Sequence, residues 1–417
     1  MLKKLTAFLF VITAIIIAAA CFSWAADKQD KKDDLYKQVE LFSNTLAIVK
    51  AEYVNETSPK QLIYGALKGM ISSLDPYSQF MDPDSYNELK VDTEGKFGGL
   101  GIEITIDKGL LTVITPIEDT PAWKAGIKPN DRIVKINTEL TRDITLSDAV
   151  KKMRGKPGEP VTLTILREKE KKVLDITVIR DIIKIKDIKE ARILEDGIAY
   201  IKLIEFRENT CADLQAALDK LKEKGMASLI LDLRNNPGGL LDAAVKVCEK
   251  FIPKGKIIVS TKGRQDKQNL EFVSRLESSL VDLPMVILVN AGSASGSEIV
   301  AGCMQDYKRA IILGVKSFGK GSVQSVIPLR DGCALRLTTS KYFTPLGREI
   351  HNKGIIPDIV VEEETSNNDK EKTSEDLKNE IFEDLEKNAQ PQEVEFKPDK
   401  QVNHAIDVLK AISIYKK

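Results

Sequence analysis

Histidine and cysteine are scarce in this chain of 417 residues, and their scarcity limits the chemistry that it can carry. The two histidines are His351 and His404, and the five cysteines have no metal-ligand spacing. We therefore expect neither a metal centre nor a cofactor. A Ser-His-Asp hydrolase would need one of the two histidines, of which one follows a surface-like turn and the other lies in a polar terminal helix. Neither is excluded as a base.

A net charge is also absent, because 62 Lys and Arg residues balance 62 Asp and Glu residues. A chain without a global field gives no sign of a nucleic-acid partner. Aromatic residues make up 6% of the sequence, which is low but compatible with a folded protein. The chain is too long for one hydrophobic core, so several domains are expected.

The N-terminus differs from the rest of the chain. A short basic start precedes an uncharged stretch from Leu5 to Ala20, and small residues then lead to Ala26, as in a secretory signal peptide. An uncleaved membrane anchor and lipidation at Cys21 stay open as alternatives. All three predict an exported protein, periplasmic or on the outer face of the inner membrane, and the last two add membrane association through the N-terminus.

The patterns of periodicity and polarity divide the chain into five parts. Residues 1–25 form the signal peptide or anchor, and residues 26–87 form an N-terminal helical region. Short strands with two helices predict a small α+β module over residues 88–180. Longer strands alternate with helices over residues 181–361, which predicts an α/β core. Residues 362–417 form a charged linker and a last amphipathic helix.

A serine-rich segment follows the apolar run Met285–Asn290. A buried strand is expected to end there and a helix to begin, so that backbone N–H groups point outward. A serine at such a junction lies beside donors that can stabilise an oxyanion. Ser293, Ser295 and Ser297 all occur here, and the pattern does not choose among them. Helix capping would explain the segment equally well.

Lys320 offers a base in place of histidine. It lies between two glycines at the expected start of a strand, where the backbone can approach another element closely. A lysine acts as a base near neutral pH only if its pKa falls by about three units from about 10.4, which burial can cause. Gln324 is four residues further on, and therefore on the same face of a strand. A neutral amide can orient the amine without stabilising the ammonium form. A surface turn would explain the Gly-Lys-Gly sequence equally well.

A third segment runs from Asp232 to Gly239 and reads Asp-Leu-Arg-Asn-Asn-Pro-Gly-Gly. It follows a predicted strand and opens a helix. The N–H groups of its glycines can supply an oxyanion donor. On its own, the segment is equally typical of a structural strand–turn–helix junction.

Together the three segments resemble the carboxyl-terminal processing, or tail-specific, protease family, whose members use a Ser-Lys dyad assisted by Gln. The resemblance covers about residues 35 to 361. It includes three further motifs, namely Ser73-Leu74-Asp75-Pro76, Phe97-Gly98-Gly99-Leu100-Gly101-Ile102 and Gly354-Ile355-Ile356-Pro357-Asp358-Ile359.

The resemblance implies a role for each matching residue of the site. Ser295 would be the nucleophile, Lys320 the base and Gln324 its orienting partner. The backbone N–H groups of Gly239 and Gly296 would stabilise the oxyanion. The family usually has alanine where this chain has Gly296, and a backbone donor survives that change.

The resemblance also implies the fold, a multidomain α/β protein. A crotonase-like or Clp-protease-like α/β protease core would carry an inserted α+β PDZ domain and helical N- and C-terminal segments. In that PDZ domain Gly98, Gly99, Leu100 and Gly101 would form the loop that binds a terminal carboxylate, and Ile102 would begin the strand that pairs with the peptide.

The implied function is that of a serine endopeptidase that binds substrate C-termini and cleaves through an acyl-enzyme. Its partners would be proteins or peptides with exposed C-termini, a second copy of the chain through the helical ends, and a regulatory adaptor. An inactive PDZ scaffold and a crotonase-like acyl-coenzyme A enzyme are the alternatives. The export pattern, the PDZ-like insert and the lack of a nucleotide-binding motif oppose the second.

Overall fold

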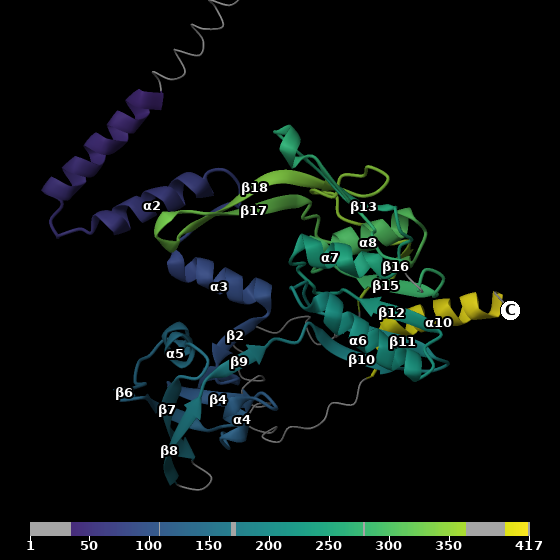
Figure 1. Ribbon diagram of the computed structural model, residues 1–417, viewed down its shortest axis with the longest axis horizontal. Helices are drawn as coiled ribbons and strands as arrows, with labels where there is room; N and C mark the ends of the chain where they lie inside the picture. Colours follow the sequence, from purple (N-terminus) through teal and green to yellow (C-terminus); the bar gives the residue numbers. More distant parts are fainter. Residues whose placement is uncertain (1–34, 108, 168–171, 278–279, 364–396, 416–417) are drawn as a thin grey trace, which may run out of the picture. The chain divides into compact units, whose positions relative to one another are not determined.

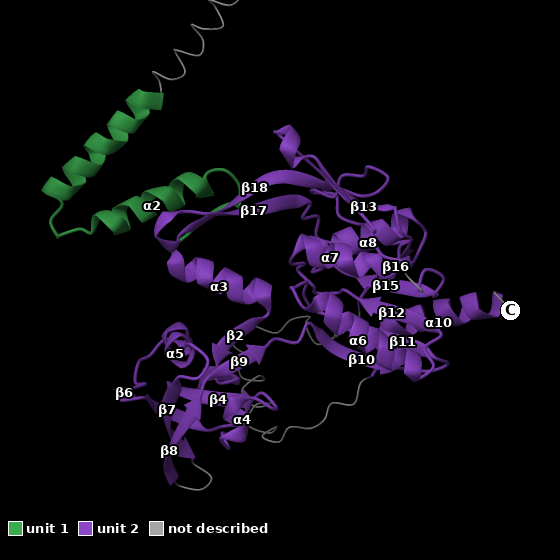
Figure 2. Cartoon of the chain, viewed as in Figure 1, with its two compact units in different colours: residues 1–82 green, residues 83–417 purple. Residues whose placement is uncertain are grey.

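The computed structural model describes residues 35–107, 109–167, 172–277, 280–363 and 397–415. The predicted signal peptide or anchor, with Cys21, lies outside these ranges. The chain divides into two compact units, residues 1–82 and 83–417 (Figure 2). Within the described ranges, no helix has both the length and the apolarity that a membrane span requires, and the four cysteines are free thiols.

The first unit contains the two helices predicted there. One covers residues 35–52, and α2 (Pro59–Ser72) begins with the proline at its first turn, where a missing N–H costs nothing. A short strand, β1 (Gln79–Met81), follows. The helix over 35–52 leaves large apolar side chains exposed, namely Leu35, Tyr36, Val39, Leu41, Phe42 and Ile48.

The second unit begins with α3 (Pro83–Glu94), a helix that spans the boundary predicted at residue 87, and continues into an α+β module (Figure 1). Antiparallel strands form a sheet of order β3-β4-β5-β7-β8, with β6 paired to β5, while β2 pairs with β9. The elements are β2 (Lys96–Gly99), β3 (Ile102–Asp107), β4 (Leu110–Pro116), α4 (Pro121–Lys124), β5 (Arg132–Ile136), β6 (Glu139–Leu140), α5 (Leu146–Met153), β7 (Pro160–Arg167), β8 (Lys172–Ile179) and β9 (Asp181–Lys184).

The α/β core is built on a second sheet, of order β10-β11-β12-β15-β16-β19. All pairs are parallel except β10 with β11. Its elements are β10 (Ile188–Ile193), β11 (Ile198–Leu203), α6 (Thr210–Glu223), β12 (Ser228–Asp232), α7 (Leu241–Glu249), β15 (Met285–Val289), α8 (Gly296–Asp306), β16 (Ile311–Gly314), β19 (Ile359–Val360) and α10 (Lys400–Tyr415).

Both faces of the core sheet are buried, as continuous apolar strands predict. Leu229 and Leu231 of β12 pack in one cluster with α6, α7 and α8. Ile230, between them, packs on the other face with Val402 and Ile406 of α10. The strand therefore carries no polar face, and α10 completes the core on the side opposite the other three helices.

Four further strands of the second unit form an antiparallel sheet of order β14-β13-β18-β17. They are β13 (Ile257–Gly263), β14 (Leu270–Val273), β17 (Ser322–Pro328) and β18 (Ala334–Phe343). The sequence predicted β17 but not the other three, and β17 follows the Gly-Lys-Gly segment directly.

Candidate active site

Ser295 lies at the junction between the buried strand β15 and helix α8, as the N-cap of that helix. Its φ of 51° and ψ of −109° put a non-glycine residue in a strained conformation. The neighbours Ser293 and Ser297 are 0% exposed. Their hydroxyls donate to the carbonyl oxygens of Leu233 and Asn236, at 2.8 and 2.9 Å. Two of the three serines therefore hold the loops together, which leaves Ser295 as the candidate nucleophile.

The loop after β12 lies against Ser295. A Cβ atom on Gly238 would lie 2.7 Å from the Cβ of Ser295 and 2.8 Å from the backbone nitrogen of Gly296. On Gly239 it would lie 2.1 Å from the carbonyl oxygen of Phe206. Both glycines also have positive φ, 102° and 136°, so only glycine fits here. Among the described residues, the N–H groups of Gly239 and Gly296 have no protein acceptor, as an oxyanion site requires.

Asn236 joins this loop to its neighbours and is 0% exposed. Its side chain donates to the carbonyl of Leu203 at 3.0 Å and accepts from the N–H of Gly238 at 2.9 Å. Its own carbonyl accepts from the N–H of Ala294 at 3.0 Å and from the hydroxyl of Ser297. The end of β11, the glycine loop and the serine turn are thus fixed to one another.

The carboxylate of Glu298 accepts four hydrogen bonds and is 1% exposed. Its Oε2 accepts from the backbone N–H groups of Ser295 and Lys320, both at 2.9 Å. Its Oε1 accepts from the Ser317 hydroxyl at 2.6 Å and from the Gly319 N–H at 2.7 Å. Burial raises the pKa of Glu298, and these hydrogen bonds oppose that rise. One oxygen atom therefore fixes the backbone of the candidate nucleophile and of the candidate base.

Sequence reasoning assigned no role to Glu298. The spacing Ser295-x-x-Glu298 could have identified it. A serine followed three residues later by a glutamate is the capping-box pattern at the start of a helix. The contacts of Glu298 with residues 317–320 carry no local signal, because they depend on two segments that meet only in the fold.

Lys320 is partly buried, and burial lowers its pKa. The charge of Arg336 lowers this pKa further, while Glu298 acts in the opposite direction. Lys320 lies before the first residue of β17, and a bulge follows Val323, so the argument that Lys320 and Gln324 share a strand face does not hold. The side-chain amide of Gln324 donates to the Ser322 hydroxyl at 2.8 Å.

The two histidines lie in different surroundings. The backbone nitrogen of His351 comes so close to Gly321, next to Lys320, that a Cβ atom there would lie 2.2 Å from it. The Nδ1 atom of His351 is buried and has no hydrogen-bond partner within the described ranges, so this residue is not the plain surface histidine that the sequence suggested. His404 is exposed on α10, with its Nδ1 at 2.9 Å from the Lys400 carbonyl oxygen.

A cluster of charges lies at the base of the glycine loop. Asp232 is 0% exposed and contacts Lys202 at 3.0 Å and Arg234 at 2.6 Å. Burial alone would raise the pKa of Asp232, but the hydrogen bonds and charges of these two cations hold it below its usual range. Arg234 also donates to Asp399, which directly precedes α10, and to Gln401 of α10, both at 2.8 Å. The C-terminal helix is therefore anchored beside the glycine loop.

The α+β module contains a cavity of about 110 Å³ between β3 and α5. Strand β3 is an edge strand of its sheet in the described part of the chain, and is therefore open to pairing with a peptide. Gly98 is not among the residues that line the cavity. A Cβ there would lie 2.0 Å from the carbonyl oxygen of Gly155, so this position packs closely against that backbone. The lining residues are Phe97, Gly99, Leu100, Gly101, Ile102, Ile104, Val150, Met153 and Arg154.

Three profiles of known families match the sequence. Peptidase family S41 matches residues 197–361, a PDZ domain matches residues 112–167, and the N-terminal domain of the activating protease CtpB matches residues 17–85.

Individual relatives match most of the chain. The carboxy-terminal-processing protease of Bartonella bacilliformis is 44% identical over 360 residues, which cover 85% of this chain and 82% of that protein. A probable CtpA-like serine protease of Staphylococcus epidermidis is 36% identical over 358 residues, or 86% of this chain and 71% of that protein. Among solved structures, the photosystem II D1 C-terminal processing protease is 28% identical and covers 76% of this chain and 86% of its own, with a TM-score of 0.45.

Proposed function

Because the chain belongs to the S41 family of carboxy-terminal-processing serine proteases and carries a PDZ domain, we propose that it cleaves peptide bonds with Ser295 as nucleophile and Lys320 as general base. The observation that carries this assignment is the shared acceptor, since Oε2 of Glu298 binds the backbone N–H of both residues at 2.9 Å. A nucleophile needs a base held beside it in a fixed geometry.

The reaction follows from the groups around Ser295. Neutral Lys320 takes the hydroxyl proton of Ser295, whose Oγ attacks the peptide carbonyl carbon, and the N–H groups of Gly239 and Gly296 stabilise the resulting oxyanion. The carbon–nitrogen bond then breaks as the Lys320 ammonium protonates the leaving amine. Water attacks the acyl-enzyme ester as Lys320 removes its proton. The ester bond then breaks, Lys320 passes that proton to the Ser295 oxygen, and the carboxylate product leaves. Gln324 is assigned as the neutral partner that orients the amine on the family resemblance alone.

We also propose that the PDZ domain binds the C-terminus of the substrate. The peptide adds a strand to the open edge of β3, its terminal carboxylate meets N–H groups of residues 99–101, and its last side chain enters the cavity of about 110 Å³. The guanidinium of Arg154 lines the same cavity and adds a positive charge near an incoming carboxylate. Gly98 is assigned a packing role against Gly155 instead.

A fluorophosphonate probe tests the nucleophile without a substitution, because such probes form a covalent bond with an activated serine. We expect one adduct per chain, located by peptide mass spectrometry on Ser295.

Hydrogen exchange tests the binding of the tail. A peptide with an apolar C-terminal residue and a free carboxylate should protect backbone amides of the PDZ domain from exchange, and the matching peptide with a C-terminal amide should not. An adduct on Ser293 or Ser297, or equal protection by both peptides, contradicts the proposal.

The pH dependence of cleavage tests the base. Arg336 lowers the pKa of Lys320, so Arg336→Gln should raise that pKa and leave less neutral amine at a given pH. The acid limb of log kcat/KM against pH, which reports the free enzyme, should therefore move to higher pH, with the rate recovered in alkaline buffer. Arg336→Lys keeps the positive charge and should keep the limb near its original position. An acid limb that does not move in Arg336→Gln excludes Lys320 as the titrating base.

Histidine is the rival base, and His351 is the better placed of the two. We expect His351→Gln to retain kcat within about threefold and to leave the acid limb unchanged, because removal of a true general base costs about 10²-fold or more. His404→Gln, on the exposed face of α10, serves as the matched control for loss of a histidine. A collapse of kcat in His351→Gln alone, with normal thermal unfolding, would transfer the base role to that residue.

Export and assembly are proposed on separate grounds. The basic start and apolar stretch of residues 1–25 support a signal peptide or anchor, and hence a periplasmic location or attachment to the outer face of the inner membrane. The exposed apolar residues of the helix over 35–52 support homodimerisation through the N-terminal region. Cell fractionation would test the location, and the molar mass in solution, measured by light scattering, would test the dimer. A regulatory adaptor stays a proposal on the family resemblance alone.

A further inference from the structure

One side chain, that of Arg207, holds both segments through which the chain enters and leaves the PDZ domain. Its Nε donates to the carbonyl oxygen of Asp92, before the domain, at 2.9 Å. Its guanidinium also donates to the carboxylate of Asp187, after the domain, at 2.5 Å. The side chains of Arg207 and Asp187 are only 10% and 1% exposed. Arg207 therefore links the protease core to two segments, the first crossing (residues 92–95) and the second crossing (residues 181–188).

Further contacts tie the two crossings to each other and to Arg207. The N–H of Ile185 donates to the carbonyl of Gly95 at 2.8 Å. Gly95 has a φ of 66°, and a Cβ there would lie 2.9 Å from the Cδ of Arg207, so the crossing lies directly on the arginine side chain. The hydroxyl of Thr210 donates to Asp187 at 2.5 Å and accepts from the backbone N–H of Arg207 at 2.7 Å.

The preceding residue, Phe206, contacts both proposed oxyanion donors. Its N–H donates to the Gly238 carbonyl at 2.8 Å, and its own carbonyl accepts from the N–H of Leu240 at 2.7 Å, which brackets Gly239. Its ring lies under the serine turn, 3.1 Å from the point that a Cβ of Gly296 would occupy. Phe206 is 0% exposed and closely packed, so a shift of its backbone must displace the residues that contact it.

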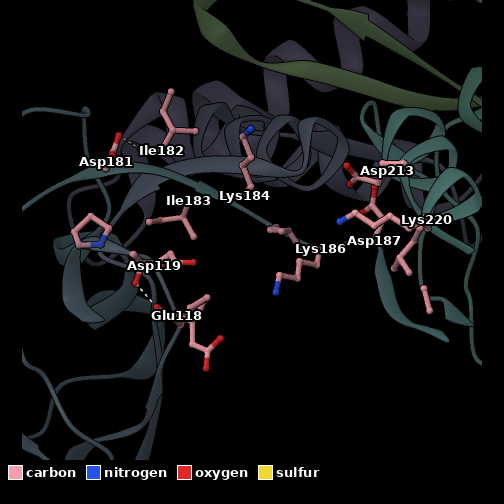
Figure 3. Close-up of a pocket in the computed structure, with 18 of the residues that line it drawn as sticks. Glu118, Asp119, Asp181, Ile182, Ile183, Lys184, Lys186, Asp187, Asp213 and Lys220 are labelled. Carbon is pink, nitrogen blue, oxygen red and sulfur yellow. Dashed lines mark hydrogen bonds between the residues drawn. The ribbon is translucent and has the colours of Figure 1, made fainter. Parts of the chain in front are cut away.

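The second crossing has room to move. Residues 181–188 line a cavity of about 660 Å³ together with side chains of α6. Figure 3 shows Asp187 of the crossing beside Asp213 and Lys220 of that helix, with Lys184 and Lys186 further along the crossing. A segment that borders open space can be displaced at a lower cost than one enclosed in a core.

We propose that Arg207 is a positioning residue through which the PDZ domain controls the oxyanion donors. Displacement of the crossings, when a substrate tail occupies the PDZ domain, moves the Arg207 backbone and with it Phe206, which sets the positions of Gly239 and Gly296. The rate of the chemical step then depends on the tail even at saturating substrate. This inference rests on the proposed function, because it assumes tail binding and an oxyanion site at those glycines.

The test compares two peptides that differ only at the C-terminus, one a free carboxylate and the other an amide. For the full-length wild-type protein we expect a higher kcat with the carboxylate. In Arg207→Gln and in Asp187→Asn, the ratio of the two kcat values should fall by about fivefold or more, toward one, which is a usual size for coupling between sites. The dissociation constant of the carboxylate peptide, measured on the Ser295→Ala background, should stay within about twofold of its original value.

The control is a second buried ion pair, Arg167 with Asp131, which has side chains 12% and 1% exposed and lies wholly within the PDZ domain. Arg167→Gln removes a pair of the same kind without touching the crossings, so it should keep the wild-type ratio. Thermal unfolding follows every variant. If Arg207→Gln does not fold, the nearly isosteric Asp187→Asn carries the test.

The outcomes separate the inference from the function on which it rests. The inference alone fails if the wild-type kcat depends on the tail and folded Arg207→Gln or Asp187→Asn keeps the same ratio. It also fails if Arg167→Gln loses the ratio to the same extent, since general loosening would then explain the result. The inference alone also fails if the wild-type ratio is one. The proposed function fails, and the inference with it, if Ser295→Ala still cleaves or if the carboxylate peptide does not bind the PDZ domain.

Discussion

Replacing Ser295 with alanine should lower kcat by about six orders of magnitude, the cost of removing the nucleophile alone from a serine protease. The reason is chemical, because the hydroxyls of the two neighbouring serines are held in buried hydrogen bonds to carbonyl oxygens and cannot replace that of Ser295. Thermal unfolding should hardly change. Steady-state kinetics with an unstructured peptide would give the loss in kcat, and calorimetry or circular dichroism would give the stability.

The neighbouring serines provide matched controls, because their replacement should lower stability and leave kcat nearly unchanged. Ser293 and Ser297 are fully buried, and each hydroxyl donates to a carbonyl oxygen. Ser293→Ala and Ser297→Ala should therefore cost about 1–3 kcal/mol of stability, the penalty for leaving a buried acceptor unpaired, while keeping most of kcat. Cleavage that survives in Ser295→Ala but disappears in one of these two variants would reassign the nucleophile.

The elements that carry the site were predictable because their signals are local. The apolar run of β15, the small residues after it and the periodicity of α8 predict a buried strand, a tight turn and a helix in that order. Helix α5 (Leu146–Met153) is one of the two helices predicted in residues 88–180, because its apolar face and its N-cap threonine lie within a few residues of each other. The α/β core follows from the alternation of such segments.

Other features were not predictable because they depend on segments that meet only in the fold. Strand β18 (Ala334–Phe343) is mostly half-buried and shows no strict alternation, so its pattern is weak. Lys320 was expected at a strand start, but the glycines on either side keep it in a loop. Gly98 has the composition of a carboxylate loop, and its role against Gly155 appears only when the two backbones are placed together. The contacts of Arg207 with Asp92 and Asp187 are of the same kind.

The site depends on a glutamate that takes no part in the chemical steps. Each carboxylate oxygen of Glu298 accepts two hydrogen bonds, one oxygen from Ser295 and Lys320 and the other from Ser317 and Gly319. Glutamine has the same shape but only one acceptor oxygen. Whichever way the amide of Glu298→Gln is turned, one pair of donors faces an NH₂ group. Either the two catalytic backbones or the loop that leads to Lys320 must then move.

We therefore expect Glu298→Gln to lower kcat by about 10²- to 10³-fold with KM little changed, because a displacement of about 1 Å can cost 10²-fold in rate. Labelling of Ser295 by the fluorophosphonate probe should slow in parallel, while binding of a tail peptide to the PDZ domain should not change. Glu249→Gln is the matched control, since Glu249 is also a buried glutamate, 6% exposed, that accepts a backbone N–H, from Arg275 at 2.8 Å. A kcat that falls equally in both variants would reduce Glu298 to an ordinary structural residue.

The pH dependence of stability separates this positioning role from a loss of folding. Because burial raises the pKa of Glu298, the folded protein holds that proton more tightly than the unfolded chain. The contribution of this carboxyl to stability is therefore present at acid pH and is lost as the pH rises through its raised pKa. Glutamine cannot ionise, so unfolding of Glu298→Gln should lack that component, and its stability relative to wild type should improve as the pH rises from acid to neutral. A variant that gains relative stability at neutral pH while its kcat stays low at the same pH has lost positioning and not its fold.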